Sequence, residues 1–384
     1  MSSSFPPEII DLVIDQLHDE PDALKACCLV SKSWIPRARM HLLAHVEFDP
    51  LEHLPESWMK IFPDPPKSPA HYARTLSIRN FPAFAFMGED AGAWIRTFHK
   101  VIHFRLERCT WINRPSAPDS LAPFFGFSPN VRSLRLTSTP FEIFNLICSF
   151  PLLEDLELVD ISNKDADAGW SAPSTSPKLT GSLRLIARGW TRFTIRRLLD
   201  FPDGLRFTKI TLMCFGDDFG SVTDLVSACS GTLENLSICR FFRSGFLQPL
   251  RLSRTLPLLV DVGTDRVRFP DLSKASKLKV LGFTGKGSIV HWVIAALRSV
   301  ESKNLQGITI RLNTATFRDE ETDNREWEDL DQLLVQFWTS HSIRPRLVYS
   351  PNSEGRDMRE YAPSLLPGLT RGGLVDLVEL PPPF

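Results

Sequence analysis

The stretch FPPEIIDLVIDQLHDEPDALKACCLVSKSWIPRARMHLLAHVEFD, residues 5–49, carries the signals of three consecutive helices. Pro6 and Pro7 suit a helix start, because the backbone N–H groups of a first turn have no acceptor within the helix. Apolar residues then recur at spacings of three and four, which predicts an amphipathic helix from about Pro7 to His18. These apolar residues are Ile9, Ile10, Val13, Ile14 and Leu17.

Two shorter helices are predicted after the first. Pro21 marks the second start, and residues 23–30 are so small and apolar that we expect a central helix packed on two sides. Ser31 is a candidate cap for a third helix over residues 32–43. Some forty residues with this many apolar side chains have more apolar surface than they can bury among themselves, so we interpret the segment as a docking module.

These residues resemble the F-box, the module by which substrate receptors attach to the Skp adaptor of SCF ubiquitin ligases. The matching positions are Phe5-Pro6, Glu8-Ile9-Ile10, the stripe from Ile14 to Leu17, Leu24, and Cys28-Leu29-Val30-Ser31-Lys32-Ser33-Trp34. The sequence of this segment is especially similar to those of the F-box proteins of mushroom-forming fungi, although Phe5 stands where the family more often has Leu. The alternative for this segment is an ordinary three-helix cap on the domain that follows.

The resemblance implies which side chains face the adaptor. For Trp34 the alternative is a place in the core of the module. The implied adaptor-binding residues are Phe5, Pro6, Ile9, Ile14, Leu17, Leu24, Val30 and Trp34.

Composition and net charge favour a folded protein that binds charged partners through local patches of its surface. The 384 residues include 44 Lys and Arg against 45 Asp and Glu, so we expect no net attraction to nucleic acid or to a membrane surface. We see no signal segment and no run long enough to cross a bilayer. Seven scattered cysteines suit buried thiols in a reducing compartment, which predicts a cytoplasmic or nuclear protein.

A short apolar-polar-apolar pattern recurs after a proline-rich connector, residues 49–72, and predicts nine strands. The predicted strands are residues 75–79, 103–107, 133–137, 155–159, 182–186, 209–213, 235–239, 280–284 and 307–311. Most begin 22 to 30 residues after the previous one, but 45 residues separate Leu236 from Leu281. We therefore expect a further unit hidden around residues 259–262.

Amphipathic segments between the strands predict helices, and the last part of the chain continues the alternation. The predicted helices are residues 141–150, 222–229, 289–300, 326–338 and 359–366, and the predicted closing strands are residues 345–349 and 374–380. The fold class is therefore α/β. A strand and a helix every 20 to 30 residues predict a leucine-rich-repeat solenoid, with a parallel sheet on the concave face and helices outside.

The pattern resembles the irregular leucine-rich repeats often found behind an F-box. It departs from the regular repeat by unequal spacing and by the missing asparagine after each strand. A doubly wound α/β domain is the competing fold. We prefer the solenoid, because polar residues in the middle of each strand indicate one uncovered sheet face.

No sequence signature of catalysis, of a cofactor site or of a metal site is present. Gly282 to Gly287 lacks the spacing of a phosphate loop and is interpreted as an ordinary turn. The histidine pairs His41 with His45 and His99 with His103 lack further ligands at metal-site spacing. We therefore predict no enzyme activity, no cofactor and no metal.

The middle positions of three strands carry Arg105, Arg135 and Arg184. Period-two alternation places them on the uncovered face of the sheet. Arginine suits capture of carboxylate or phosphate, so this basic stripe is a candidate site for an acidic or phosphorylated segment of a client protein. A solvated face without a ligand is the alternative.

The resemblance and the repeats together predict a substrate-receptor subunit of an SCF-type cullin ubiquitin ligase. Residues 1–48 would dock on the Skp adaptor, and through it on a cullin, and residues 73–384 would hold a client of unknown identity. A repeat scaffold without any link to ubiquitin is the second hypothesis, and an unrecognised hydrolase is the third.

Overall fold

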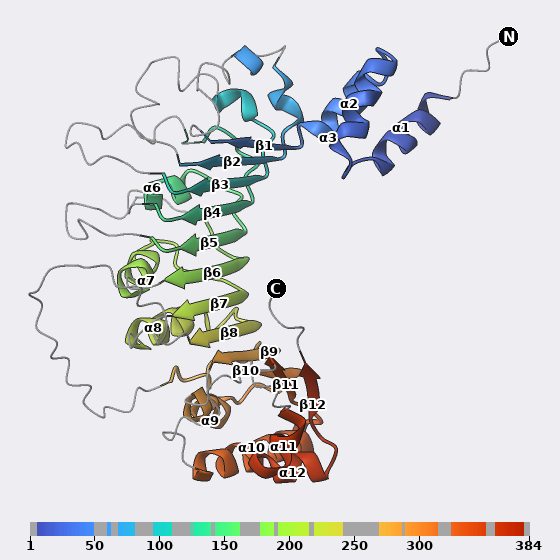
Figure 1. Ribbon diagram of the computed structural model, residues 1–384. Helices are drawn as coiled ribbons and strands as arrows, with labels where there is room; N and C mark the ends of the chain where they lie inside the picture. The colour runs from blue at the N-terminus through green and yellow to red at the C-terminus, as the bar shows by residue number, and fades with distance from the viewer. Residues whose placement is uncertain are drawn as a thin grey trace, which may run out of the picture. The chain divides into compact units, whose positions relative to one another are not determined.

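The computed structural model describes residues 6–49, 60–62, 68–80, 95–109, 124, 126–139, 143–161, 177–187, 191–214, 219–240, 269–285, 289–313, 324–350 and 358–379. The chain divides into two compact units (Figure 1). The first unit is residues 1–179 with 201–203, and the second is residues 180–200 with 204–384. Each unit is a parallel β-sheet with helices, so the predicted α/β class is confirmed.

Three helices open the first unit: α1 (Pro7–Gln16), α2 (Pro21–Val30) and α3 (Ile35–Leu42). The predicted starts at Pro7 and Pro21 are confirmed. The third helix begins later than predicted, because a helix from Lys32 would need a hydrogen bond from the backbone nitrogen of Pro36, which carries no hydrogen. In α3 that proline sits in the first turn, where no donor is needed.

Five parallel strands form the sheet of the first unit and pair in chain order. They are β1 (His45–Phe48), β2 (Thr75–Arg79), β3 (His103–Glu107), β4 (Ser133–Thr137) and β5 (Asp155–Val159). The shorter helices of this unit are η1 (Pro69–Tyr72), η3 (Arg96–Phe98) and α6 (Ile143–Cys148). Residues 45–48, just beyond the predicted third helix, form β1, which was not predicted.

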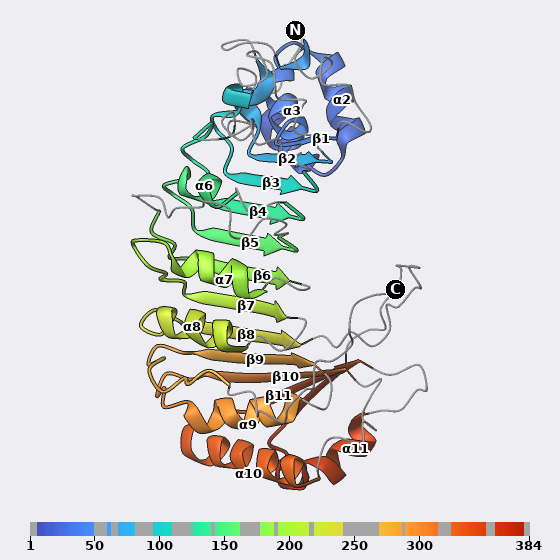
Figure 2. The same ribbon diagram turned by 90° about the vertical axis from the view of Figure 1, so that its left-hand side faces the viewer.

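The second unit contains seven parallel strands, again paired in chain order. They are β6 (Ser182–Ala187), β7 (Lys209–Cys214), β8 (Asn235–Arg240), β9 (Val280–Gly285), β10 (Gly307–Asn313), β11 (Arg346–Ser350) and β12 (Asp376–Glu379). Its helices are α7 (Thr191–Leu199), α8 (Phe219–Cys229), α9 (Val290–Ser299), α10 (Asn324–His341), α11 (Met358–Leu365) and α12 (Pro367–Arg371). Figure 2 shows α7, α8 and α9 following one another along one side of this sheet.

All nine predicted strands and both closing strands are confirmed, to within a few residues at their ends. Apolar side chains at alternate positions, such as Phe104 and Leu106 in β3, are fully buried, whereas Arg105 between them is exposed. This is the burial pattern of a sheet with one covered face.

Three expectations for the strands and connections need comment. β8 pairs directly with β9, so the predicted hidden unit adds no strand between them, and residues 259–262 lie outside the described part of the chain. Gly282 to Thr284 fall in both the predicted strand 280–284 and the predicted turn, and the structure places them, with Gly285, within β9. Helix α7 was not predicted, and the connector at 49–72 falls mostly outside the described residues.

The entry to successive strands repeats one hydrogen-bond pattern in both units. The backbone N–H groups of Arg132 and Ser133 both donate to the carbonyl of Ile102, at 2.9 and 3.1 Å. In the second unit Gln306 and Gly307 donate in the same way to Lys279, at 2.7 and 3.1 Å. The repeated pattern means that each unit stacks equivalent turns of chain.

A serine fixes the same turn once in each unit. The Ser128 hydroxyl donates to the carbonyls of His99 and Val101 at 3.0 and 2.8 Å, and the Ser302 hydroxyl lies 3.0 and 2.9 Å from the carbonyls of Ser276 and Leu278. Both serines are buried and are followed two residues later by asparagine. Our sequence analysis missed this Ser-x-Asn repeat.

Replacing Ser128 by Ala should lower the free energy of unfolding by about 1 to 3 kcal/mol, because two backbone carbonyls lose a buried donor. Chemical denaturation followed by circular dichroism measures the change. Ser230→Ala is the matched control: its hydroxyl bonds only to Ser227 in an exposed turn, so the change should stay within about 0.5 kcal/mol. Equal effects of the two substitutions would contradict the assigned role.

Candidate docking surface

The helical cluster formed by α1, α2 and α3 has a small core. Its buried residues are Ile14, Leu24, Cys27 and Ala38, and the partly buried residues packed against them are Ile10, Leu17, Cys28, Trp34 and Leu42. All three helices contribute. The cluster is therefore held together by one narrow face of each helix.

Large apolar side chains are exposed on α1 and α2. Among the described residues eight large hydrophobic side chains are exposed, and five of them lie on these two helices. They are Ile9, Leu12, Val13, Leu29 and Val30, with exposed fractions of 45%, 59%, 57%, 89% and 65%. We call these five residues the apolar docking surface. Such a concentration is typical of a protein interaction site, whereas single exposed apolar residues are common everywhere.

The apolar stripe of α1 is divided between two faces. Ile10, Ile14 and Leu17 point into the cluster, and Ile9, Leu12 and Val13 point out. Residues at i, i+3 and i+4 share a helix face, so the exposed three form a continuous strip.

Helix α2 is packed on one side only, which corrects our expectation of a helix packed on two sides. Leu24 and Cys27 are buried, whereas Leu29 and Val30 are exposed. The composition of α2 is that of a doubly covered helix, but the residues that the structure describes cover only one of its sides.

The residues predicted to bind the adaptor are divided in the same way. Pro6, Ile9 and Val30 are exposed. Ile14 and Leu24 lie in the cluster core, with Leu17 and Trp34 packed against it, and Phe5 lies outside the described residues.

Leu12, Val13 and Leu29 were not among the predicted binding residues. The i, i+3, i+4 spacing from Ile9 was the available signal for Leu12 and Val13. Leu29 is the most exposed of the large hydrophobic side chains that the structure describes.

A charged network joins α1 to α3. The Arg37 side chain donates from Nε to Oδ1 of Asp15 at 2.6 Å and pairs through Nη2 with Oδ2. Nε2 of His41 lies 2.8 Å from the same Oδ1. The contacts of Asp15 therefore hold α1 against α3 in one orientation, with the exposed strip turned outward.

The Arg37 hydrogen bond, and next the His41 hydrogen bond, lower the pKa of Asp15 to about 2. A pKa depressed on folding adds stability above the unfolded value of 3.8, and this contribution is lost as the pH falls towards 2. Thermal unfolding should therefore show that wild type loses more melting temperature between pH 5 and pH 2 than Asp15→Asn. Parallel pH profiles of the two proteins would contradict this. Asp22→Asn is the control: Lys25 also lowers the pKa of Asp22, but this pair is exposed, so its removal should change the pH profile less than removal of Asp15.

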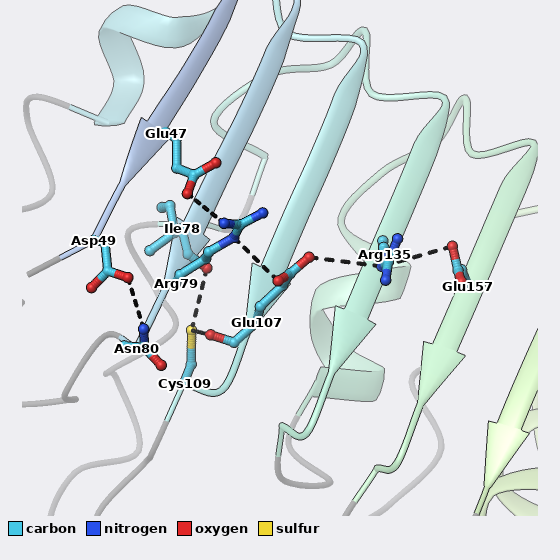
Figure 3. Close-up of polar contacts among 9 residues, drawn as sticks. All are labelled: Glu47, Asp49, Ile78, Arg79, Asn80, Glu107, Cys109, Arg135 and Glu157. Carbon is cyan, nitrogen blue, oxygen red and sulfur yellow. Dashed lines mark hydrogen bonds and ion pairs between the residues drawn. The ribbon is translucent and has the colours of Figure 1, made fainter. Parts of the chain in front are cut away.

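Opposite charges alternate across the polar face of the first unit (Figure 3). Arg79 lies 2.6 Å from Glu47 and 3.2 Å from Glu107, and Arg135 lies 3.8 Å from both Glu107 and Glu157. Each contact joins neighbouring strands from β1 to β5. The carboxylates thus offset the positive charge of Arg135.

The three arginines of the predicted basic stripe are therefore not equivalent. Arg105 is exposed and lies in register beside Arg135. Arg184 is exposed on β6 of the second unit. Capture of a client by these three side chains stays a prediction. The carboxylates of Glu107 and Glu157 beside Arg135 make this arginine a weaker candidate than the other two.

The described residues contain no group of three or more His, Cys, Asp or Glu side chains placed to hold a metal ion. No helix in the described ranges is long and apolar enough to span a membrane. Burial raises the pKa of the Cys148 thiol to about 12 and that of Cys229 to about 11, so both are protonated at neutral pH.

A scan against protein-family models finds no match to this chain, and a search of curated proteins finds none either. The function is therefore inferred from the residues and their geometry.

Proposed function

We propose that this chain is a substrate receptor of an SCF-type ubiquitin ligase. The apolar docking surface on α1 and α2 would bind the Skp adaptor, and the strand-and-helix units that follow, arranged as an irregular leucine-rich-repeat solenoid, would hold a client protein. The observation that carries the proposal is the exposure of five large apolar side chains on two helices of one small cluster.

Two further observations support this assignment. The exposed residues fall within the segment that resembles an F-box, and Leu29 and Val30 belong to its Cys-Leu-Val-Ser-Lys-Ser-Trp signature. The repeated entry turns and the parallel pairing in chain order are what a repeat domain requires.

The proposed role is not catalytic. The receptor holds a client near the ubiquitin-conjugating enzyme that the cullin carries, and this proximity raises the effective concentration of client lysines at the thioester.

Co-expression with a Skp adaptor tests the proposal. We expect the full chain alone to aggregate through the apolar docking surface, and we expect the adaptor to rescue it as a one-to-one complex, measured by pull-down and size-exclusion chromatography. A monodisperse free chain that does not retain the adaptor would instead favour the second candidate, a repeat scaffold without a link to ubiquitin.

A further inference from the structure

A pocket of about 550 Å³ opens on the polar face of the second unit. Strands β7 to β12 line it, and its lining includes three cationic side chains: Lys209, Arg311 and Arg346. No carboxylate is among the described residues that line it. This distinguishes it from the polar face of the first unit, where Glu47, Glu107 and Glu157 accompany the arginines.

The two arginines of the pocket lie on adjacent strands. Thr309 of β10 is in register with Arg346 of β11, and Arg311 follows two residues along β10. Strand spacing and rise put their Cα atoms about 8 Å apart, within the reach of both guanidinium groups for one ligand. Asp376, the register neighbour of Arg346 on β12, is engaged by Arg344 at 3.0 Å. No carboxylate among the described lining residues offsets the charge of this pair.

The floor of the pocket is made of small residues in one register row. Thr211, Ser237, Gly282 and Thr309 follow one another across β7 to β10. A Cβ atom at Gly282 would lie 3.3 Å from the Ser237 hydroxyl, so the missing side chain gives the pocket depth. Three hydroxyl groups along this floor can bond to a ligand, and Val348 and Val378 add apolar wall.

We propose that this pocket binds a phosphorylated segment of the client protein. This proposal rests on the proposed function, because it assumes that the chain is a receptor that binds a client protein. Arg311 and Arg346 clamp the phosphoryl group, and the floor hydroxyls bond to the adjoining peptide. Lys209, at the opposite end of the floor, attracts acidic residues beside the phosphorylated one.

A phosphoryl group fits this donor set better than a side-chain carboxylate. Two guanidinium groups and the Thr309 hydroxyl offer more donors than the two oxygens of a carboxylate can use. A phosphoryl group has three acceptor oxygens and close to two negative charges at pH 7, and arginine binds it with paired N–H donors. The pocket was not predicted from the sequence because its two arginines, at positions 311 and 346, are 35 residues apart in the chain.

The test uses the full chain, co-expressed with the adaptor, and fluorescent degenerate peptide libraries with a central phosphoserine or phosphothreonine. Unphosphorylated and glutamate twins of each library are measured in parallel by fluorescence polarisation. We expect at least tenfold tighter binding of the phosphorylated libraries, with loss in high salt. Arg311→Gln and Arg346→Gln should each weaken binding at least tenfold, and Gly282→Val should weaken it without any change in charge.

Arg206→Gln is the matched control, because it removes an exposed arginine of the same unit that does not line the pocket, and it should leave binding unchanged. Equal affinity for phosphorylated and glutamate libraries, or full affinity in both arginine variants, would overturn the proposal. Adaptor pull-down on the same samples separates the two claims. Loss of phosphopeptide binding with the adaptor retained contradicts only the pocket, and the reverse result contradicts only the receptor role.

Discussion

Replacing Leu29 by Asp should weaken binding of the Skp adaptor by about 30-fold, equivalent to about 2 kcal/mol for a central anchor of an interface. Leu29 is 89% exposed in the free chain, so its side chain contributes little to folding. An aspartate at this position would have to lose its hydration against an apolar partner surface. Isothermal titration calorimetry with the purified adaptor measures the affinity.

Leu152→Asp is the matched control for this experiment. Leu152 is also a large exposed apolar residue of the first unit, at 45%, but it lies outside the helical cluster. Its substitution should leave adaptor affinity unchanged. If Leu29→Asp binds the adaptor as wild type does, the apolar docking surface is not the adaptor interface.

Replacing Phe104 by Ala should lower the free energy of unfolding by about 3 to 5 kcal/mol, a large part of the stability of an ordinary domain. The ring is fully buried on β3. Its centroid lies 4.9 Å from that of Phe127, 5.8 Å from that of Phe124 and 6.1 Å from that of Phe150. Removing it leaves a cavity among three rings that come from later turns of the chain.

The next residue along β3 provides the control. Arg105 faces the opposite side of the same strand and is exposed, so Arg105→Ala should change the free energy of unfolding by less than about 0.5 kcal/mol. Urea denaturation of the two variants measures the difference. Comparable losses for both would contradict the alternation of buried and exposed residues on which the fold assignment rests.

The strands were predictable because each one satisfies a local rule. Leu134 and Leu136 flank Arg135 in β4, and this alternation alone places the apolar pair on one face and the arginine on the other. The later start of α3 was also within reach of the sequence, since Pro36 forbids an earlier one. Strand β1 was missed because its four residues directly follow a helix with apolar residues of its own.

The candidate site was predicted less well than the strands. Ile14 and Val13 are neighbours in one apolar helix, yet Ile14 is fully buried and Val13 is 57% exposed. Periodicity shows that both are apolar but not which face another helix covers. The carboxylates that accompany Arg135 come from β3 and β5, and no local pattern connects them to it.

The helix starts at Pro7 and Pro21, the positions of the predicted strands and the face on which each strand side chain lies follow from local sequence, because proline stereochemistry and backbone periodicity are local properties. Only the folded chain shows which apolar residues of α1 and α2 remain uncovered, which arginines lie beside carboxylates, and that Arg311 and Arg346 share a pocket. These depend on distances between residues far apart in the chain, and strand pairing sets those distances.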